Sequence, residues 1–251
     1  WQAMSAGYLK MPVVLRVSIG AKYGAQHSQD WTAMFAHVPG LKVVYPVTPY
    51  DCKGLMNTAL IGTDPVIFLE NQKIYDIGEQ FHKEGVPEGY YEIPFGEPDI
   101  KRAGKDVTIL TIGPSLYKAM EAADVLSTEY GIEAEVIDAR SIVPFNYEPV
   151  LESVHKTGRI VIVGEACARG SIMSEIAAQI TTMAFDDLDA PPAVIGSRNW
   201  IAPLGSQEAA YYPQVDTILD AIHELIVPLA GRENKANFAT KETIRRNKLG
   251  V

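Results

Sequence analysis

Residues 41–71 read LKVVYPVTPYDCKGLMNTALIGTDPVIFLEN, with two short apolar runs on either side of a helical pattern. The runs Leu41–Pro46 and Pro65–Glu70 are rich in Val and Ile and lack strict alternation, which is typical of strands buried on both faces. Over Cys52–Leu60 the apolar residues recur with the spacing of a helix face, and Thr48 stands where an N-cap belongs. The stretch therefore predicts a strand, a covering helix and a second, parallel strand.

The same alternation extends over the rest of the chain. Helical spacing recurs at 31–38, 116–126 and 215–226, where Gly131 is predicted to close the second helix and Pro213 to stand in the first turn of the third. Alternating strands and helices of this kind predict an α/β fold with a mostly parallel sheet. The further apolar runs lie at Pro12–Ile19, Val107–Ile112, Glu133–Ile137, Ile160–Val163 and Ala193–Ile195.

The alternation lapses over Asp76–Gly104, a stretch rich in Gly, Pro and charge, where we expect a linker. A chain of 251 residues is long enough for two ordinary domains, so we expect one over 1–94 and another over 97–230. The tail 231–251 lacks a sustained apolar face and is predicted to be an arm on the surface or on a partner. Residues 1–10 read as helix without a start signal, which indicates that the sequence begins inside an element.

Charge and composition exclude several classes of function. The formal net charge of -9 argues against a nucleic-acid partner, because phosphate binding needs clustered Lys and Arg. The sequence has no run of about 18 apolar residues, so we expect no membrane span. Two cysteines, Cys52 and Cys167, are too few for a disulfide framework and indicate a reducing compartment. Neither a zinc-type spacing nor a G-x-G-x-x-G fingerprint is present.

The segment Gly24–Asp30, GAQHSQD, follows a predicted strand and precedes a helical pattern. His27 thus falls in a strand-to-helix connection, where parallel sheets place ligand-binding groups. Its imidazole titrates near neutrality, and Gln26, Ser28 and Gln29 offer donors and acceptors that can fix its tautomer. A loop histidine also commonly serves only as a cap or a solvated surface residue, so the residues alone leave both interpretations open.

Two carboxylates have simpler explanations than catalysis. Glu70 and Glu165 are predicted to lie at strand ends and to bond to nearby backbone.

Several blocks, in order along the chain, resemble one enzyme family. GAQHSQ, then HVPGLKVVYPVTPYDCKGLMNTAL, then DPVIFLEN are similar to the β subunits of pyruvate, branched-chain 2-oxo acid and acetoin dehydrogenase E1 components. GEACARGSIMSEIAAQI at 164–180 and Leu188–Pro191 continue the likeness, which reaches about residue 227. The resemblance implies the C-terminal portion of a pyrimidine-binding domain, followed by a transketolase C-terminal-like α/β domain.

The resemblance also implies a function, the thiamine-diphosphate-dependent oxidative decarboxylation of a small-molecule 2-oxo acid with acyl transfer to a lipoyl group on E2. In the family the β subunit joins an E1 α subunit in an α₂β₂ heterotetramer, and Mg²⁺ and the cofactor diphosphate lie mainly on α. By the match of AQHSQ, His27 is the catalytic residue, with Gln26 and Gln29 beside the cofactor. The Glu and the aromatic residue that contact the aminopyrimidine precede the matched part and map to no residue here. We expect the bacterial cytoplasm, or the mitochondrial matrix in a eukaryote.

A K⁺ site is a further implication of the resemblance. It maps to Val13 and to Ala59, Leu60, Gly62 and Asp64 around the end of a predicted helix. The last carbonyls of a helix lack partners and form the negative end of its dipole, which suits a cation. An ordinary helix end closed by Gly62 explains the same residues.

The connection Arg16–Gly24 departs from the family, whose loop here is longer and richer in Gly. Lys22 and Tyr23 add bulk and charge, so the identity of the 2-oxo acid is not predicted. Two other functions stay open. A transketolase-type two-carbon transfer enzyme uses the same cofactor but needs several cationic groups for sugar phosphates, and only Arg16, Lys22 and His27 are candidates. A non-catalytic assembly or docking subunit is the alternative from a different class.

Overall fold

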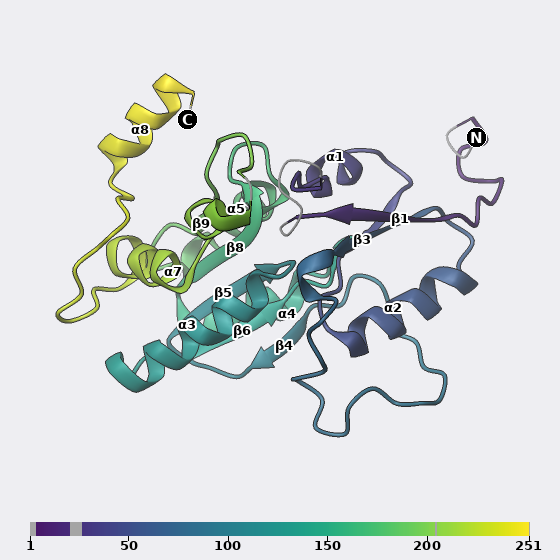
Figure 1. Cartoon of the computed structure of the whole chain (residues 1–251), viewed down its shortest axis with the longest axis horizontal. Coiled ribbons are helices and arrows are strands. Elements are labelled where there is room, and N and C mark those ends of the chain that lie inside the picture. The colour runs from purple at the N-terminus through teal and green to yellow at the C-terminus, as the bar shows by residue number, and fades with distance from the viewer. Residues whose placement is uncertain (1–3, 21–26, 204, 251) are drawn as a thin grey trace.

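Two sheets with helices packed against them make up the part of the chain that the structure describes, residues 4–20, 27–203 and 205–250 (Figure 1). The structure is a computed structural model. The strands are β1 (Val14–Ile19), β2 (Lys42–Val44), β3 (Val66–Asn71), β4 (Asp99–Arg102), β5 (Val107–Ile112), β6 (Ala134–Asp138), β7 (Ser141–Val143), β8 (Ile160–Cys167) and β9 (Ala193–Ser197). The helices are α1 (Thr32–Ala36), α2 (Pro49–Ile61), α3 (Ser115–Tyr130), α4 (Glu148–Thr157), α5 (Ile172–Met183), α6 (Glu208–Tyr211), α7 (Val215–Ala221), which continues as the π turn η5 (Ile222–Ile226), and α8 (Thr240–Leu249).

The first sheet has the strand order β1-β3-β2-β7. β1 and β2 both run parallel to β3, with Val14 opposite Val66 on one side and Lys42 opposite Val66 on the other. α2 connects β2 to β3, and Thr48 Oγ1 accepts a hydrogen bond from the Asp51 N–H at 3.1 Å. The strand–helix–strand unit predicted from residues 41–71 is therefore confirmed, including its N-cap.

The second sheet has the order β4-β6-β5-β8-β9, in which all neighbours are parallel except β4 and β6. α3 packs on β5, β6 and β8 and touches α7, while α4 packs on β5 and α5 on β8 and β9. Gly131 closes α3 with a φ of 65°, as its position after the helical pattern predicts. The α/β class with mostly parallel sheets is confirmed.

Some elements are not predicted by the sequence patterns, namely β4, β7, α4, α5 and α8. β4 lies inside the expected linker Asp76–Gly104 and reads DIKR. Its antiparallel pairing with β6, rather than an apolar run, makes it a strand. The tail also holds a helix, α8, where only an arm is predicted.

Two helix predictions are wrong. Residues 4–10 form turns and irregular structure rather than helix, and Met4 and Tyr8 are almost fully exposed. A short helix needs tertiary packing of an apolar face, which these residues do not have here. Pro213 stands before the N-cap Gln214, outside the first turn of α7, because Gln214 and Thr217 form the capping contacts.

The two sheets share a large apolar core, and a second, smaller cluster packs α2 against the first sheet. A single cluster of buried side chains includes Ile19, Tyr45 and Leu69 from the first sheet region and Ile112 and Leu116 from the second. β7 follows β6 in the chain yet pairs antiparallel with β2, so it belongs to the first sheet. The division into 1–94 and 97–230 stays a prediction about sequence units, because the two sheets are interlocked through β7 and this core.

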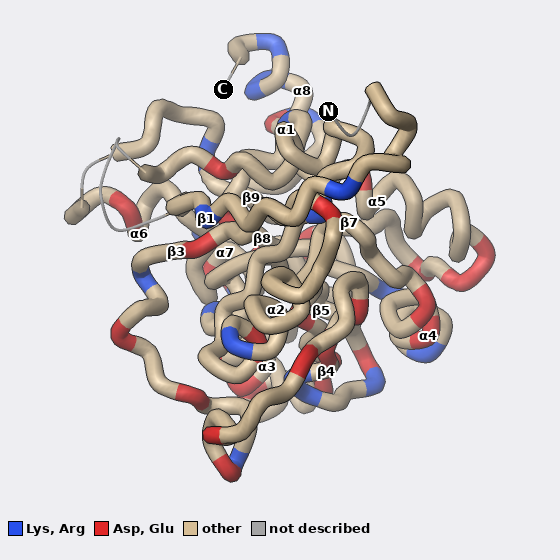
Figure 2. The backbone as a smooth tube through the Cα atoms, turned by 90° about the vertical axis from the view of Figure 1, so that its right-hand side faces the viewer, with Lys and Arg blue, Asp and Glu red and all other residues tan. Residues whose placement is uncertain are grey.

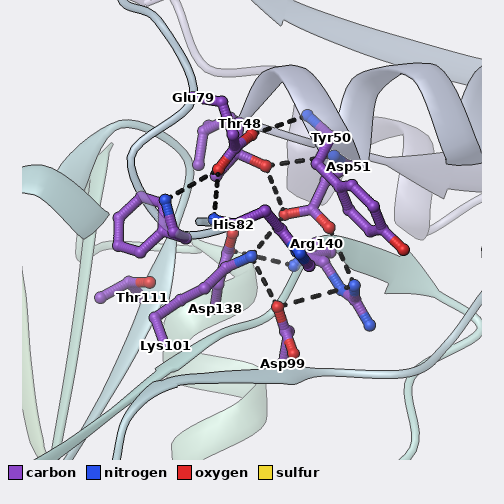
Figure 3. A network of polar contacts seen from close by, with 12 residues as sticks. Thr48, Tyr50, Asp51, Glu79, His82, Asp99, Lys101, Thr111, Asp138 and Arg140 are labelled. Carbon is purple, nitrogen blue, oxygen red and sulfur yellow. Dashed lines mark hydrogen bonds and ion pairs between the residues drawn. The ribbon is translucent and has the colours of Figure 1, made fainter. Parts of the chain in front are cut away.

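A buried network of charges lies where α2 meets β4 and the end of β6 (Figure 3). Asp51 Oδ2 lies 2.6 Å from Lys101 Nζ, and Asp51 Oδ1 lies 2.9 Å from Arg140 Nη1. Asp99 Oδ2 is also 2.6 Å from Lys101 Nζ. Burial by itself would raise the pKa of Asp51, but the two cations hold that pKa below its usual value. Burial raises the pKa of Asp138, beside them, to about 7.

The tail begins with a firm anchor and ends in an exposed helix. Buried Asp220 accepts hydrogen bonds from the backbone N–H groups of Lys235 and Ala236 and forms an ion pair of 2.6 Å with Arg232. α8 has no buried residue, and Figure 2 shows basic residues along it. Among the described residues, every helix falls short of the length and apolarity that crossing a bilayer requires.

Candidate active site

The chain around His27 lies at the carboxyl end of β1. β1 ends at Ile19, and Gly20 follows with a φ of 81°. Lys22, Tyr23 and Gln26, for which predictions are made above, lie outside the described residues. Arg16 lies within β1, so the connection after β1 begins at Gly20 and not at Arg16, as was expected.

His27 is exposed, while the next residue, Ser28, is buried. Gln29 is exposed again, and α1 begins at Thr32. The strand-to-helix placement predicted for His27 is therefore confirmed. A connection of this kind is where a parallel fold places ligand-binding groups.

A cavity of about 430 Å³, here named the loop cavity, opens beside this segment. Ser28, Gln29 and Asp30 line one side of it, and its other sides are the chain at 165–171 and the chain at 197–202 with Tyr211. His27 precedes these lining residues and does not itself line the cavity. The loop cavity thus lies between the segment that leads into α1 and the carboxyl ends of β8 and β9.

The loop cavity combines carboxylates with aromatic rings. Asp30 accepts hydrogen bonds from the Thr32 N–H at 2.9 Å and from the Thr32 hydroxyl, and burial raises the pKa of its carboxyl. Glu165 is almost fully buried at the same cavity, and Trp200 and Tyr211 supply aromatic surface. A planar, polar organic ligand matches this combination of groups.

A buried cluster of polar side chains underlies the carboxyl ends of the strands. Asn71 Nδ2 donates to Glu165 Oε2 at 2.7 Å and lies 3.3 Å from the Tyr45 hydroxyl oxygen. Burial raises the pKa of Tyr45 well above its usual value, and the charge of Glu165 adds to the rise. The cluster joins β3 to β8, and sequence reasoning missed it because its members lie far apart in the chain.

The two strand-end carboxylates bond differently from the expectation. Glu70 accepts two hydrogen bonds from Arg16, at 2.6 and 2.8 Å, and one from the Tyr75 hydroxyl at 2.9 Å. Glu165 has Asn71 as a side-chain partner. Side chains therefore bond to both carboxylates: Arg16 of β1 and Tyr75 contact Glu70, and Asn71 at the end of β3 contacts Glu165.

The residues mapped to a K⁺ site lie near one another. The Thr63 carbonyl accepts from Met11 N–H at 2.9 Å, and the Val13 carbonyl from Val66 N–H at 2.8 Å, which brings Val13 beside the end of α2. The site residues on that end are Ala59, Leu60, Gly62 and Asp64. Gly62 lies close to the last helical carbonyls, since a Cβ built on it would meet Ala59 O at 3.5 Å. Asp64 Oδ2 already lies 3.2 Å from Lys42 Nζ. Within the described residues, no three His, Cys, Asp or Glu side chains are grouped to hold a metal ion.

Two domain families match the sequence. The transketolase pyrimidine binding domain matches residues 2–77, and the transketolase C-terminal domain matches residues 96–218. The chain is 40% identical over 225 residues to the pyruvate dehydrogenase E1 component subunit beta of Rickettsia felis, which covers 88% of this chain and 67% of that protein. The chain belongs to the family of E1 β subunits.

Other E1 β relatives agree. The acetoin:2,6-dichlorophenolindophenol oxidoreductase subunit beta of Cupriavidus necator is 49% identical over 189 residues, covering 74% of this chain and 54% of that protein. The Bacillus subtilis 2-oxoisovalerate dehydrogenase subunit beta is 43% identical over 182 residues, covering 72% of this chain and 54% of that protein. The chain thus spans little more than half the length of these two relatives.

A solved structure supports the fold. A split-gene transketolase, described as an inactive beta4 tetramer, superposes with a TM-score of 0.67 and 22% identity, over 90% of this chain and 73% of that one. Identity at this level speaks for the fold alone.

Proposed function

We propose that this E1 β chain takes part in the thiamine-diphosphate-dependent oxidative decarboxylation of a 2-oxo acid, with acyl transfer to a lipoyl group. The observation that carries the proposal is the position of His27, exposed in the connection between β1 and α1 and directly before the residues that line the loop cavity. Family membership supports the reaction class, and the position supports a role for the imidazole in it.

The residues around the loop cavity suit a thiamine ring system. Its aminopyrimidine is planar with a polar edge, and the cavity offers aromatic surface at Trp200 and Tyr211 and an amide at Gln29. Gln26 and Gln29 are the proposed cofactor-binding residues. When bound, the cofactor supplies the electron sink for decarboxylation, and the protein supplies orientation and proton transfer. His27, as the proposed catalytic residue, would hold or move the proton at its ring nitrogens next to the reacting centre.

The remaining parts of the site are proposed to come from other chains. An E1 α subunit would complete the cofactor site and supply most of the Mg²⁺ and diphosphate contacts, in an α₂β₂ heterotetramer. An E2 acyltransferase would present the lipoyl group. The proposed location is the bacterial cytoplasm, or the mitochondrial matrix in a eukaryote.

The test is an assay of the full-length β subunit assembled with its α subunit, with and without thiamine diphosphate. Pyruvate and branched-chain 2-oxo acids are the substrates, and lipoyl acylation is the readout. We expect His27→Ala to abolish acylation, whereas His37→Ala, at the end of α1 and away from the loop cavity lining, should retain it. Activity on sugar phosphates and none on 2-oxo acids would favour a transketolase-type enzyme instead.

A K⁺ ion at Val13, Ala59, Leu60, Gly62 and Asp64 is a separate proposal. The end of α2 at Ile61 supports it, since the last carbonyls of a helix have no partner within the helix and form the negative end of its dipole. K⁺ should raise the melting temperature relative to Na⁺ at equal ionic strength, because the ion binds only the folded state. Equal melting temperatures in the two salts would contradict the proposal.

A further inference from the structure

Side chains from distant parts of the chain contact the connection between β1 and α1 at two described positions, Gly20 and Ser28. On the first side, Gly20 follows β1 and lies against Asn71 and Glu165. Asn71 ends β3, whereas Glu165 belongs to β8, and the two are joined by a hydrogen bond of 2.7 Å. The bond therefore ties the two sheets together at the point where the chain leaves β1 toward His27.

The contact at Gly20 is too close for any other residue. A Cβ on Gly20 would lie 1.9 Å from Asn71 Nδ2 and 2.6 Å from Glu165 Oε2. Asn71 is itself fixed, because its Oδ1 accepts from the Lys73 N–H at 2.9 Å. The backbone at Gly20 thus lies in direct contact with the buried, hydrogen-bonded side chains of Asn71 and Glu165.

On the second side, Tyr212 holds Ser28. The Tyr212 hydroxyl donates to the Ser28 carbonyl oxygen at 3.3 Å, and both residues are buried. The Tyr212 ring packs edge-on against Tyr211, with ring centroids 4.7 Å apart. Since Ser28 directly follows His27, this hydrogen bond fixes the backbone immediately after the histidine.

We infer that Tyr212 is a positioning residue, which orients His27 by holding the adjacent Ser28 in place, and that Glu165 fixes the start of the same connection at Gly20. The inference rests on the proposed function, because it assigns His27 to the reaction. A displacement of about 1 Å at a reacting group can cost about a hundredfold in rate. The contact at Ser28 restricts the backbone next to the ring, and the contact at Gly20 restricts the start of the connection.

The second half of the chain therefore contributes to the reaction without carrying the histidine. Glu165 lies at the end of β8 and Tyr212 just after α6, so both belong to the part that matches the transketolase C-terminal domain. Loss of either anchor should lower the turnover rate more than substrate binding, since a misplaced catalytic group acts mainly in the transition state.

The experiment compares Tyr212→Phe and Glu165→Gln with the wild type, each assembled with the α subunit. We expect kcat to fall about tenfold while KM for the 2-oxo acid stays within about twofold. In Tyr212→Phe, amide hydrogen exchange at residues 27–32 should accelerate about fivefold, which corresponds to the loss of one hydrogen bond of about 1 kcal/mol. The melting temperature of each variant separates this local effect from unfolding.

Tyr117→Phe is the matched control. It removes a tyrosine hydroxyl that donates to the Val47 carbonyl at 2.8 Å, also between the two halves of the chain but away from His27. We expect wild-type kcat and wild-type exchange at residues 27–32 from this control.

Wild-type exchange and kcat in Tyr212→Phe, or a fall in kcat no larger than that of Tyr117→Phe, would overturn the inference. If Glu165→Gln does not fold, Tyr212→Phe decides alone, since it keeps the ring. A wild-type complex inactive on every 2-oxo acid would contradict the proposed function instead, and the exchange data would still decide whether the anchors hold the segment.

Discussion

Lys101 Nζ lies 2.6 Å from Asp51 Oδ2, and the side chains of both residues are withdrawn from solvent. The pair joins the first turn of α2 to the edge strand β4, with Arg140 as a second cation on Asp51. A buried ion pair stabilises little compared with apolar packing, but removing one partner leaves an uncompensated charge.

Lys101→Met should therefore destabilise the fold. We expect a loss of about 3–5 kcal/mol in the free energy of unfolding, because Asp51 and Asp99 lose their shared ammonium in a buried site. Urea unfolding measures the loss. The control is Lys118→Met, whose partner Glu121 is half exposed, and it should cost less than about 1 kcal/mol. Equal losses in the two variants would contradict this account.

Asp138 should make stability depend on pH. Its pKa of about 7 in the fold exceeds the value of about 3.9 in the unfolded chain, so between these values the folded state holds the extra proton. Stability from this group is fully present below pH 4 and is lost as pH rises toward 7. Burial is the main cause of the raised pKa of Asp138. The nearby charges are consistent with an uncharged Asp138, because the cations Lys101 and Arg140 already pair with Asp51 and Asp99.

Asp138→Asn removes that titration. The difference between the wild-type and variant unfolding free energies should change by an amount on the order of 4 kcal/mol from pH 4 to pH 8, in favour of the variant at high pH. Urea titrations at four or five pH values measure it. Parallel curves for the two proteins would show that Asp138 titrates normally.

Gly20→Ala should disturb the fold where the two sheets meet. The substitution forces a φ of 81° on alanine and places a methyl group against Asn71 and Glu165, so we expect a loss of about 3 kcal/mol. Gly131→Ala is the control, because Gly131 also has a positive φ but open space around it. Gly131→Ala should lower the free energy of unfolding by about 1 kcal/mol. A similar loss at both positions would mean that Asn71 and Glu165 can move away from the added methyl group at little cost.

The tail should show two separate behaviours. Asp220→Ala removes the acceptor for Arg232 and for the backbone of Lys235 and Ala236. It should lower the free energy of unfolding by about 3 kcal/mol and expose residues 232–238 to limited proteolysis.

Removing residues 240–251 should change the unfolding free energy by less than about 1 kcal/mol, since α8 buries no residue. A large loss on truncation would contradict this reading of α8.

The sequence by itself determined the strand–helix–strand unit of residues 41–71, its cap at Thr48, the closing glycine at 131 and the family. These features depend on local periodicity, on capping chemistry and on ordered motifs, all of which are visible in neighbouring residues. The position of His27 after a strand was likewise predictable, because β1 and α1 are local patterns on either side of it.

Only the tertiary structure decided which distant groups contact the connection that carries that histidine. Asn71 bonds to Glu165 between the two sheets, and Tyr212 bonds to Ser28, although the members of each pair are widely separated in the chain. The same holds for β4 and β7, short strands whose identity comes from a partner rather than from their own apolar pattern. Long-range pairing and burial depend on how whole elements pack, and that information is not contained in any local stretch of residues.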